Sequence, residues 1–359
     1  MAHLLFAAYD PGGANMLLPV MPLARGRGHR TSALAAGPAA AVWRDAGEEV
    51  VDVGGGEAAM RDPLDRLAPG LVVTGTGYAD FERTLWRLAR DRGTRSLAAI
   101  DSWTNLRRRF LCVDGTEVQP DAICVVDEPT RDRILGEGWC RVPLHVTGQP
   151  HLEAVVRRLG GRRAQRKPTD TPLLVFFSES LRRDHGGEGL GFDQFTVADA
   201  LVPALAGLGP LTLVIQPHPR DDRGEWEAWV RGRRVPDGVA LTLGAEDTES
   251  LLVACDGAIG MTTMVLMEAA LLGVPVLSLQ PGRTRVLNPG LTALDGLRVV
   301  TGDYDIAPAM AGFVRALGRP APAGPACSPL LVEDAGRRFL AAVEAELRAP
   351  QTAPRKGEA

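Results

Sequence analysis

The chain has 359 residues, 45% hydrophobic and 23% charged, which is the composition of a globular protein too long for one ordinary core. Its net charge of -4 argues against a general nucleic-acid binder, and its apolar runs are shorter than the roughly 18 residues of a membrane-spanning helix. The five cysteines form no CxxC pair, which argues against a zinc site and a disulfide framework. We therefore expect a cytoplasmic protein of two domains, without a metal or stable membrane insertion. A signal peptide is not expected either, because "MAHLLFAAYDPGG" lacks a basic region.

The first half of the chain alternates short apolar runs with helical patterns, and this alternation predicts a parallel sheet covered by helices. Strands are predicted at 4–9, 31–36, 49–53, 71–75, 96–100, 122–126 and, with its exit, 145–150. Helices are predicted over 14–26 and 80–93. In the second of these, Phe81, Leu85 and Leu88 fall on one face and predict which side is buried.

A charged, aperiodic stretch interrupts this alternation at 157–172 and is predicted to be a linker. It would join an N-terminal domain, residues 1–156, to a C-terminal domain, residues 173–348, which a disordered tail at 349–359 follows. In the second domain strands are predicted at 173–178, 211–216, 239–243, 249–255, 257–260, 275–279 and 297–301, and helices near 194–208, 224–232, 263–272 and 331–348. The expected fold class is α/β, with two Rossmann-like domains whose parallel sheets face a cleft. Ligands of such sheets lie outside the carboxyl ends of the strands.

The first candidate site is "YDPGGANM" (9–16), which follows a strand and opens a helix. Asp10 stands at the strand tip, where a base would face the cleft, and Gly12 and Gly13 would let the backbone approach an acceptor. The alternative is an ordinary turn in which Asp10 caps the helix. The spacing is not GxGxxG, so a dinucleotide site is not supported.

The stretch "AIDSWTNLRRRF" (99–110) follows another strand of the same domain. Trp103 and Asn105 are candidate acceptor-binding residues, and Asp101 is the second candidate for the base. The "TGTGY" turn at 74–78 would line the same pocket. The arginine run 107–109 could meet an acidic acceptor or a membrane surface, but such runs are more often solvated faces.

In the second domain, "VIQPHPRDD" (214–222) places a histidine directly after a strand, between two prolines that restrict its position. His218 would donate to a phosphate oxygen and Arg220 would assist it. The alternative is a surface turn with an incidental histidine. Ser178, Glu179 and Ser180, after the first strand of this domain, are candidates to contact a diphosphate.

The stretch "IGMTTMVLMEAALLGVPVLSLQPG" (259–282) is apolar except for one carboxylate. Thr262 and Thr263 offer hydroxyls and backbone N–H groups at a helix start, which suits a phosphate. Glu268, surrounded by apolar residues, would accept hydrogen bonds from the two hydroxyls of a ribose. The alternative is a glutamate on the solvent edge of the helix.

These residues together resemble the GT-B superfamily, which contains nucleotide-sugar glycosyltransferases and non-hydrolysing UDP-GlcNAc 2-epimerases. The resemblance spans about residues 1–300 and rests on the GG turn, "VTGQP" before the linker, and "GMTTMVLMEAALLGVPVL". "QPHP" resembles the His-Pro element of bacterial sialyltransferases and CDP-glycerol transferases. The resemblance implies that His218 contacts the nucleotide phosphate, that Thr262 and Thr263 bind phosphate or diphosphate, that Glu268 binds ribose, and that Asp10 is the general base.

The epimerase motifs "GDT", "EAGLRT", "HRREN" and "DSGG" are replaced here by "GTG", "AIDSWTN", "SESLRRD" and "GMTT". We therefore expect an inverting, metal-independent glycosyltransferase that needs no cofactor. It would move a sugar from a nucleotide-sugar donor to a small-molecule or glycan acceptor. A UDP-GlcNAc 2-epimerase-like isomerase is the first alternative, and a non-catalytic nucleotide-sugar-binding protein is the second. No nucleic-acid partner is expected, a homodimer is compatible with the sequence, and the nucleotide base, sugar and acceptor stay open.

Overall fold

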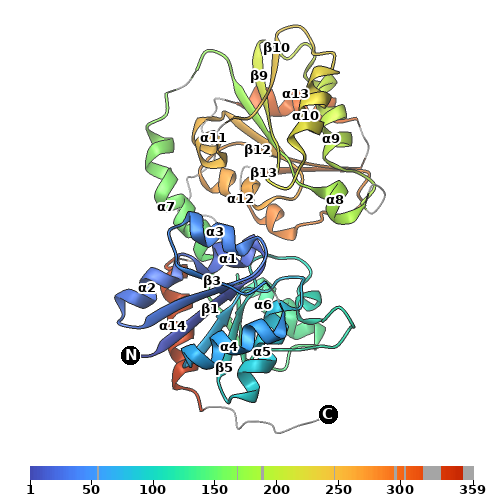
Figure 1. Ribbon diagram of the computed structural model, residues 1–359. Coiled ribbons are helices and arrows are strands. Elements are labelled where there is room, and N and C mark those ends of the chain that lie inside the picture. Colours follow the sequence, from blue (N-terminus) through green and yellow to red (C-terminus); the bar gives the residue numbers. More distant parts are fainter. Residues whose placement is uncertain are drawn as a thin grey trace. The chain divides into compact units, whose positions relative to one another are not determined.

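The computed structural model describes residues 1–54, 56–167, 169–186, 190–245, 247–294, 297–302, 305–317 and 333–350. The chain divides into two compact units (Figure 1). The first contains Met1–Ala154 and Leu330–Ala359, and the second contains Val155–Pro329. No helix within the described residues combines the length and the apolar character that crossing a bilayer requires.

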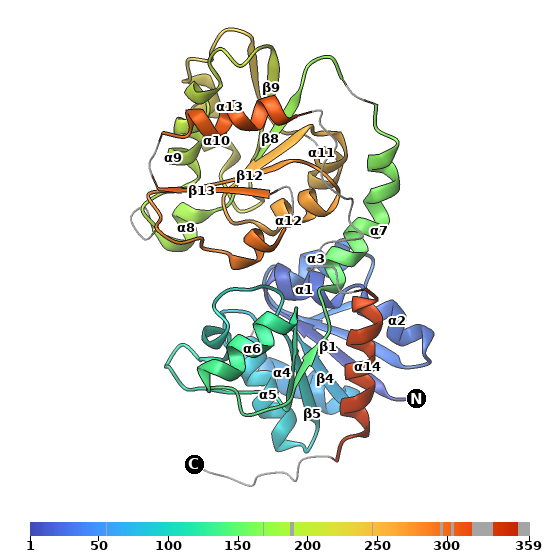
Figure 2. The ribbon, with the colours of Figure 1, turned by 180° about the vertical axis from the view of Figure 1, so that it is seen from behind.

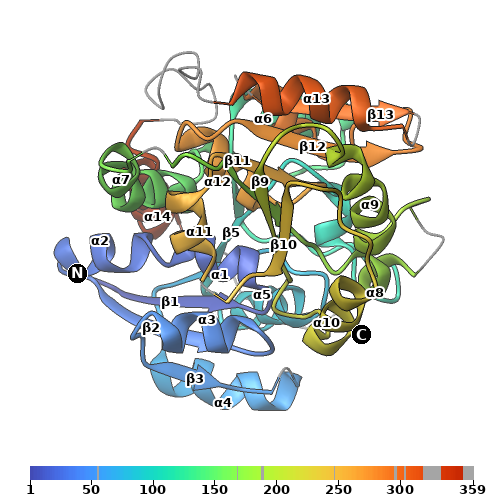
Figure 3. The same cartoon turned by 90° about the horizontal axis from the view of Figure 1, so that it is seen from above.

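The first unit is built on a parallel sheet in the order β3-β2-β1-β4-β5-β6-β7. Figure 3 shows β1, β2 and β3 following one another toward one edge. Its central strand is buried on both faces from Leu4 to Ala8, which explains its continuous apolar run. The strands are β1 (His3–Ala8), β2 (Arg30–Ala35), β3 (Val50–Asp52), β4 (Leu71–Thr74), β5 (Arg95–Ala99), β6 (Ala122–Val125) and β7 (Leu144–Val146).

Helices cover both faces of this sheet, because successive side chains of β1 point to opposite sides. Leu4 and Phe6 pack with α1, α2, α3 and α14, whereas Leu5 and Ala7 pack with α4 and α5. The apolar face predicted for the second helix is confirmed, since Leu85 is fully buried there. The helices are α1 (Pro11–Leu17), α2 (Val20–Gly26), α3 (Ala39–Asp45), α4 (Glu57–Leu67), α5 (Phe81–Asp91), α6 (Glu128–Glu137), α14 (Ala335–Arg348) and the 3₁₀ turn η1 (Arg107–Phe110).

Three predicted boundaries differ from the structure. The helix predicted over 14–26 is two helices, because Pro19 cannot donate a backbone hydrogen bond and separates α1 from α2. The predicted linker is helical at its start: α7 (Pro150–Ala164) covers residues 157–164. The junction of the two units falls inside this helix, after Ala154.

The last predicted helix belongs to the other domain than expected. α14 packs in the core of the first unit through Phe339 and Val343 and lies beside α2 (Figure 2). Its Glu346 is ion-paired with Arg95 of β5 and accepts a hydrogen bond of 2.9 Å from His145 of β7. An amphipathic pattern shows that a helix buries one face, but it does not show which sheet that face covers. Most of the predicted tail, 349–359, lies outside the described residues.

The second unit has a parallel sheet in the order β10-β9-β8-β11-β12-β13. Its core includes Phe176 of β8, Phe195 and Trp226, whose rings lie in contact. The strands are β8 (Leu173–Phe177), β9 (Leu211–Gln216), β10 (Val239–Leu243), β11 (Gly257–Gly260), β12 (Val276–Pro281) and β13 (Leu297–Gly302). The helices are α8 (Leu181–His185), α9 (Gln194–Leu201), η2 (Pro203–Leu205), α10 (Arg223–Arg231), α11 (Thr248–Ala254), α12 (Met264–Leu271), η3 (Pro289–Ala293) and α13 (Ala307–Ala316). The strand predicted at 249–255 is wrong: this segment is α11, which Asp247 caps by accepting a hydrogen bond from the N–H of Ser250.

Each sheet contains one point where the chain reverses the direction in which it adds strands. In the first unit this switch point lies between β1 and β4, and in the second it lies between β8 and β11. Connections on the two sides of such a point leave in opposite directions, so the carboxyl ends of these two strands are where α/β sheets bind ligands. The predicted sites follow these four strands and their immediate neighbours.

Candidate functional site

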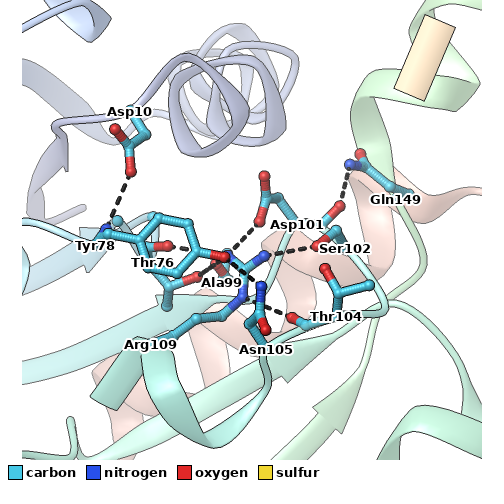
Figure 4. Close-up of polar contacts among 12 residues, drawn as sticks. Asp10, Thr76, Tyr78, Ala99, Asp101, Ser102, Thr104, Asn105, Arg109 and Gln149 are labelled. Carbon is cyan, nitrogen blue, oxygen red and sulfur yellow. Dashed lines mark hydrogen bonds and ion pairs between the residues drawn. The ribbon is translucent and has the colours of Figure 1, made fainter. Parts of the chain in front are cut away.

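Asp10 ends β1 at the switch point of the first unit. Its Oδ2 accepts a hydrogen bond of 3.1 Å from the backbone N–H of Tyr78, in the turn after β4 (Figure 4). Asp10 is the N-cap residue of α1, as in the alternative prediction, but in the described chain its side chain makes no capping hydrogen bond to this helix. The carboxylate is therefore fixed across the switch point, where it remains partly exposed.

The two glycines after Asp10 have separate structural roles. A Cβ on Gly13 would lie 3.0 Å from the Cα of Gly75, and one on Gly12 would lie 2.0 Å from Oδ2 of Asp101. Gly13, together with Gly75, lets two backbone segments meet across the switch point. Gly12 lets the Asp101 carboxylate approach the start of α1. An acceptor contact by Gly12 or Gly13 stays a prediction, but these close approaches explain both glycines.

Arg109 holds the polar groups of this edge together. It is 6% exposed, and it donates hydrogen bonds of 2.6 Å to Oδ1 of Asp101, 2.6 Å to Oγ of Ser102 and 3.0 Å to Oγ1 of Thr76 (Figure 4). Its neighbours Arg107 and Arg108 are exposed, as predicted for the arginine run, but Arg109 is not. Because a guanidinium presents donors in a fixed plane, it fixes the orientation of the Asp101 carboxylate.

Trp103 and Asn105, the predicted acceptor-binding residues, contact other parts of the same unit. Trp103 is 6% exposed and donates its indole N–H to Oδ2 of Asp127 at 2.6 Å. Asn105 adopts a left-handed conformation, with φ of 54°, and donates to the hydroxyl of Tyr78 at 2.7 Å. These contacts give both residues a role in shaping the edge, and contact with an acceptor stays a prediction.

In the second unit, Asp221 organises the residues after β8 and β9. Its carboxylate accepts hydrogen bonds from the hydroxyls of Ser178 (2.9 Å) and Ser180 (2.8 Å), and from the indole N–H of Trp226 (3.0 Å). The backbone N–H of His218 also donates to it, at 3.2 Å. Both serines predicted to contact a diphosphate are thus held by this carboxylate.

His218 is oriented by its Nδ1 atom, which accepts a hydrogen bond of 3.1 Å from the backbone N–H of Arg220. The neutral ring therefore carries its proton on Nε2, which can donate to an anion. Burial, assisted by the cation of Arg220, lowers the pKa of His218, so the neutral ring is favoured at pH 7. Arg220 itself forms a two-point ion pair with Asp184, at 2.6 and 2.8 Å, which partly neutralises it.

The start of α12 already binds a carboxylate. Glu179 accepts hydrogen bonds of 2.6 Å each from the backbone N–H and the hydroxyl of Thr262. Thr263 caps α12 by accepting from the N–H of Val265 at 3.2 Å. A helix start favours an acidic group, and the group that it holds in this structure is the carboxyl of Glu179 of the same unit. Burial raises the pKa of Glu179, which its bonds to Thr262 oppose.

Glu268 lies within α12 and is 9% exposed. Its neighbours Met267 and Ala269 are fully buried. The alternative of a glutamate on a solvent edge is therefore wrong, and binding of a ribose diol stays a prediction.

Comparison with known proteins gives structural matches only. No protein-family model matches the sequence, and no curated protein gives a significant match. The UDP-GlcNAc 2-epimerase from Neisseria meningitidis, solved with UDP-GlcNAc bound, matches with a TM-score of 0.71 and 12% identity, over 96% of this chain and 100% of that one. The UDP-GlcNAc 2-epimerase from Methanocaldococcus jannaschii matches with a TM-score of 0.69 and 12% identity, over 96% of this chain and 99% of that one. The glycosyltransferase SnogD from Streptomyces nogalater matches with a TM-score of 0.52 and 17% identity, over 97% of this chain and 95% of that one.

The chain has the GT-B fold. The predicted fold class, with two Rossmann-like units built on parallel sheets, is confirmed. The identities are too low to carry an activity over from these proteins, so the chemistry must be argued from the residues at the two switch points.

Within this GT-B chain the sequence analysis missed several residues of the two edges. They are partners of the predicted residues and segments: Arg83, Arg109 and Glu82 in the first unit, and Asp221 in the second. Glu82 follows Phe81 but is turned about 100° from it around the helix, so the predicted apolar face did not identify it. Nothing in the charged stretches "RRRF" and "RDD" indicated that Arg109 and Asp221 would bind the predicted site residues. Among the described residues, no group of His, Cys, Asp and Glu side chains is placed to hold a metal ion.

Proposed function

We propose that the protein is a glycosyltransferase that moves a sugar from a nucleotide-activated donor to an acceptor hydroxyl or amine, with inversion at the anomeric carbon. The observation that carries the proposal is the arrangement after β8, β9 and β11. There an oriented imidazole, a helix start that holds a carboxyl group, and a second buried carboxyl group about one and a half turns along that helix belong to one switch point. These are groups that suit phosphate oxygens and ribose hydroxyls.

In this proposal the second unit binds the donor. His218 donates from Nε2 to a phosphate oxygen, the start of α12 at Thr262 and Thr263 stabilises the diphosphate, and Glu268 accepts hydrogen bonds from the ribose. Ser178 and Ser180 hold the loop through Asp221. Since the solved N. meningitidis epimerase of the same fold carries UDP-GlcNAc, a uridine nucleotide is the first donor to test.

The first unit supplies the base. Asp10 takes the proton from the acceptor hydroxyl while the acceptor oxygen bonds to the anomeric carbon and the bond from that carbon to the diphosphate oxygen breaks. The electron pair of the broken bond leaves with the diphosphate, whose charge the donor-binding groups stabilise. Asp101, held by Arg109 at 2.6 Å, is the second candidate for the base.

A second function is favoured by the structural matches. The two UDP-GlcNAc 2-epimerases match with TM-scores of 0.71 and 0.69, whereas the glycosyltransferase SnogD matches with 0.52. An epimerase would use the same donor site but would need no acceptor. Incubating the protein with a nucleotide sugar alone separates the two functions, because only an epimerase releases an altered sugar under those conditions.

The test of the donor site is thermal stabilisation by UDP, GDP, TDP, CDP and CMP, since a bound ligand raises the melting temperature by mass action. We expect one of these nucleotides to stabilise the wild type, and Glu268→Ala to lose most of that stabilisation. Glu249→Ala is the matched control, because Glu249 is a partly exposed glutamate of α11 in the same unit. Equal stabilisation of wild type and Glu268→Ala would contradict the assignment of Glu268.

With the nucleotide identified, transfer is measured with its sugar donors and a panel of acceptors. The anomeric configuration of the product is read by NMR. Retention of configuration would contradict the role given to Asp10, and tight nucleotide binding without any turnover would favour a non-catalytic binding protein.

A further inference from the structure

Three carboxylate oxygens converge beside Gly77, in the turn after β4. A Cβ at this glycine would lie 2.8 Å from Oδ2 of Asp10, 3.1 Å from Oε2 of Glu82 and 3.2 Å from Oε1 of Glu82. The Asp10 and Glu82 oxygens therefore lie within about 6 Å of each other, the range in which two like charges change each other's affinity for protons. Glycine at position 77 is what leaves room for this pair.

Glu82 is completely buried in the first turn of α5. Its Oε1 accepts a hydrogen bond of 3.0 Å from the backbone N–H of Tyr9, the residue before Asp10. Its Oε2 has no hydrogen-bond partner among the residues that the structure describes. A buried charge without full hydrogen bonding is costly, so this carboxyl favours its protonated form.

The charges around Glu82 do not compensate for its burial. Arg83 directs its N–H groups away from it, to the carbonyls of Gly77 and Tyr78 at 2.9 Å each. β4 presents the uncharged residues Leu71–Thr74 to α5. α4 packs against α5 through the apolar residues Met60 and Leu64. Burial chiefly raises the pKa of Glu82 to about 7. The charge of Asp10 raises it further, and the cation of Arg83 opposes the shift.

We infer that Glu82 is a positioning residue for the proposed reaction: it is the buried half of a coupled carboxylate pair, and its charge sets the basicity of Asp10. The inference rests on the proposed function. Glu82 has no exposed surface and cannot touch a substrate, so it acts only through Asp10. When Glu82 is protonated, it adds no negative charge beside Asp10. When Glu82 ionises, the second negative charge makes Asp10 bind the acceptor proton more strongly and act as a stronger base.

The first experiment does not depend on activity. Protein labelled with ¹³C at its Glu and Asp side-chain carboxyls is titrated by NMR as wild type, Glu82→Gln and Asp10→Asn. We expect one Glu signal to titrate near pH 7, to disappear in Glu82→Gln, and to move to lower pH in Asp10→Asn because the like charge is gone. A Glu82 signal that titrates at the same pH in wild type and Asp10→Asn overturns the inference.

The second experiment compares the pH dependence of kcat/KM for sugar transfer. We expect the wild type to rise through a limb near pH 7, on the order of tenfold, and Glu82→Gln to lack that limb while still transferring sugar. Glu57→Gln, at an exposed position of α4 in the same unit, should keep the wild-type profile. An unchanged limb in Glu82→Gln overturns the inference even if the NMR titration shows coupling. If neither the wild type nor any variant transfers sugar, the proposed function and this role of Glu82 are both overturned. The NMR titration still shows by itself whether Glu82 and Asp10 are coupled, so the two failures can be told apart.

Discussion

The carboxylates at the two switch points are treated differently by their surroundings. In the first unit Asp10 and the buried Glu82 converge beside Gly77, and one oxygen of Glu82 has no partner among the described residues. In the second unit Glu179 is bonded by the N–H and hydroxyl of Thr262, and Asp221 receives hydrogen bonds from two serines, a tryptophan and the backbone of residue 218.

This contrast indicates how one architecture can serve two chemical tasks. Where a buried carboxylate lacks a donor, as Glu82 does at Oε2 among the described residues, proton binding becomes favourable. Where several donors hold a carboxylate, as they hold Asp221, it serves as a scaffold. His218 Nε2 is then the group left to meet an external anion. The predictions below remove one side of this contrast at a time.

The largest effect should come from the exposed carboxylate of the first unit. Asp10→Asn keeps the size of the side chain and an acceptor for Tyr78 but cannot take up a proton. Loss of a general base lowers the rate by about 10²- to 10⁴-fold. We expect kcat for sugar transfer to fall by this amount while the nucleotide affinity, measured by calorimetry, stays at its wild-type value. A comparable loss in nucleotide affinity would contradict the assignment.

Arg109 should be the main structural support of the first edge. Arg109→Ala leaves the Asp101 carboxylate without its guanidinium in a largely buried position, and breaking such a pair costs about 3 to 5 kcal/mol. Urea unfolding measures this loss. Arg107→Ala is the matched control, because Arg107 forms an exposed pair with Glu117, and it should change the unfolding free energy by less than about 1 kcal/mol. Similar losses for the two variants would show that Arg109 does not organise the site.

Glu82 makes the stability of the protein depend on pH. Its pKa is raised from 4.5 to about 7 in the folded protein, so the folded state holds its proton to higher pH than the unfolded state does. Its contribution is therefore fully present below about pH 4.5 and is lost as the pH rises to about 7. We expect Glu82→Gln to gain up to about 3 kcal/mol relative to wild type between pH 4.5 and 8. A constant difference in unfolding free energy over that range would contradict the raised pKa.

The smallest expected effect concerns Glu179, whose carboxyl group is bonded to Thr262 at the start of α12. Glu179→Gln keeps acceptor and donor atoms for Thr262 but removes a group that can carry a negative charge beside the proposed diphosphate site. Burial raises the pKa of Glu179, so its repulsion of a second anion grows as the pH rises. Nucleotide diphosphates should therefore bind to the variant up to about tenfold more tightly, with the gain larger at higher pH, as measured by calorimetry. Tighter binding that is the same for the uncharged nucleoside would point to a change in shape and not to charge.

Much of the fold follows from patterns within short segments. Alternation of apolar runs and helical stretches predicted the strands that the structure contains, with one further strand predicted where α11 lies. The position of Asp10, His218 and Thr262 after strands followed from the same pattern. The burial of Glu268 was also predictable, because its neighbours in the helix are apolar on every side. Local periodicity reports which face of an element is buried, and that information is present in each segment by itself.

Contacts between distant segments could not be predicted in this way. The sequence alone determined two α/β units, their elements and the residues at the strand ends. Only the tertiary structure decided that α14 joins the first unit, that Arg109 is buried against Asp101, that Glu179 binds the start of α12, and that Glu82 lies beside Asp10. The physical reason is that such partners are set by strand order and by packing between segments up to hundreds of residues apart, whereas local periodicity specifies only that a polar group is buried and not which group satisfies it.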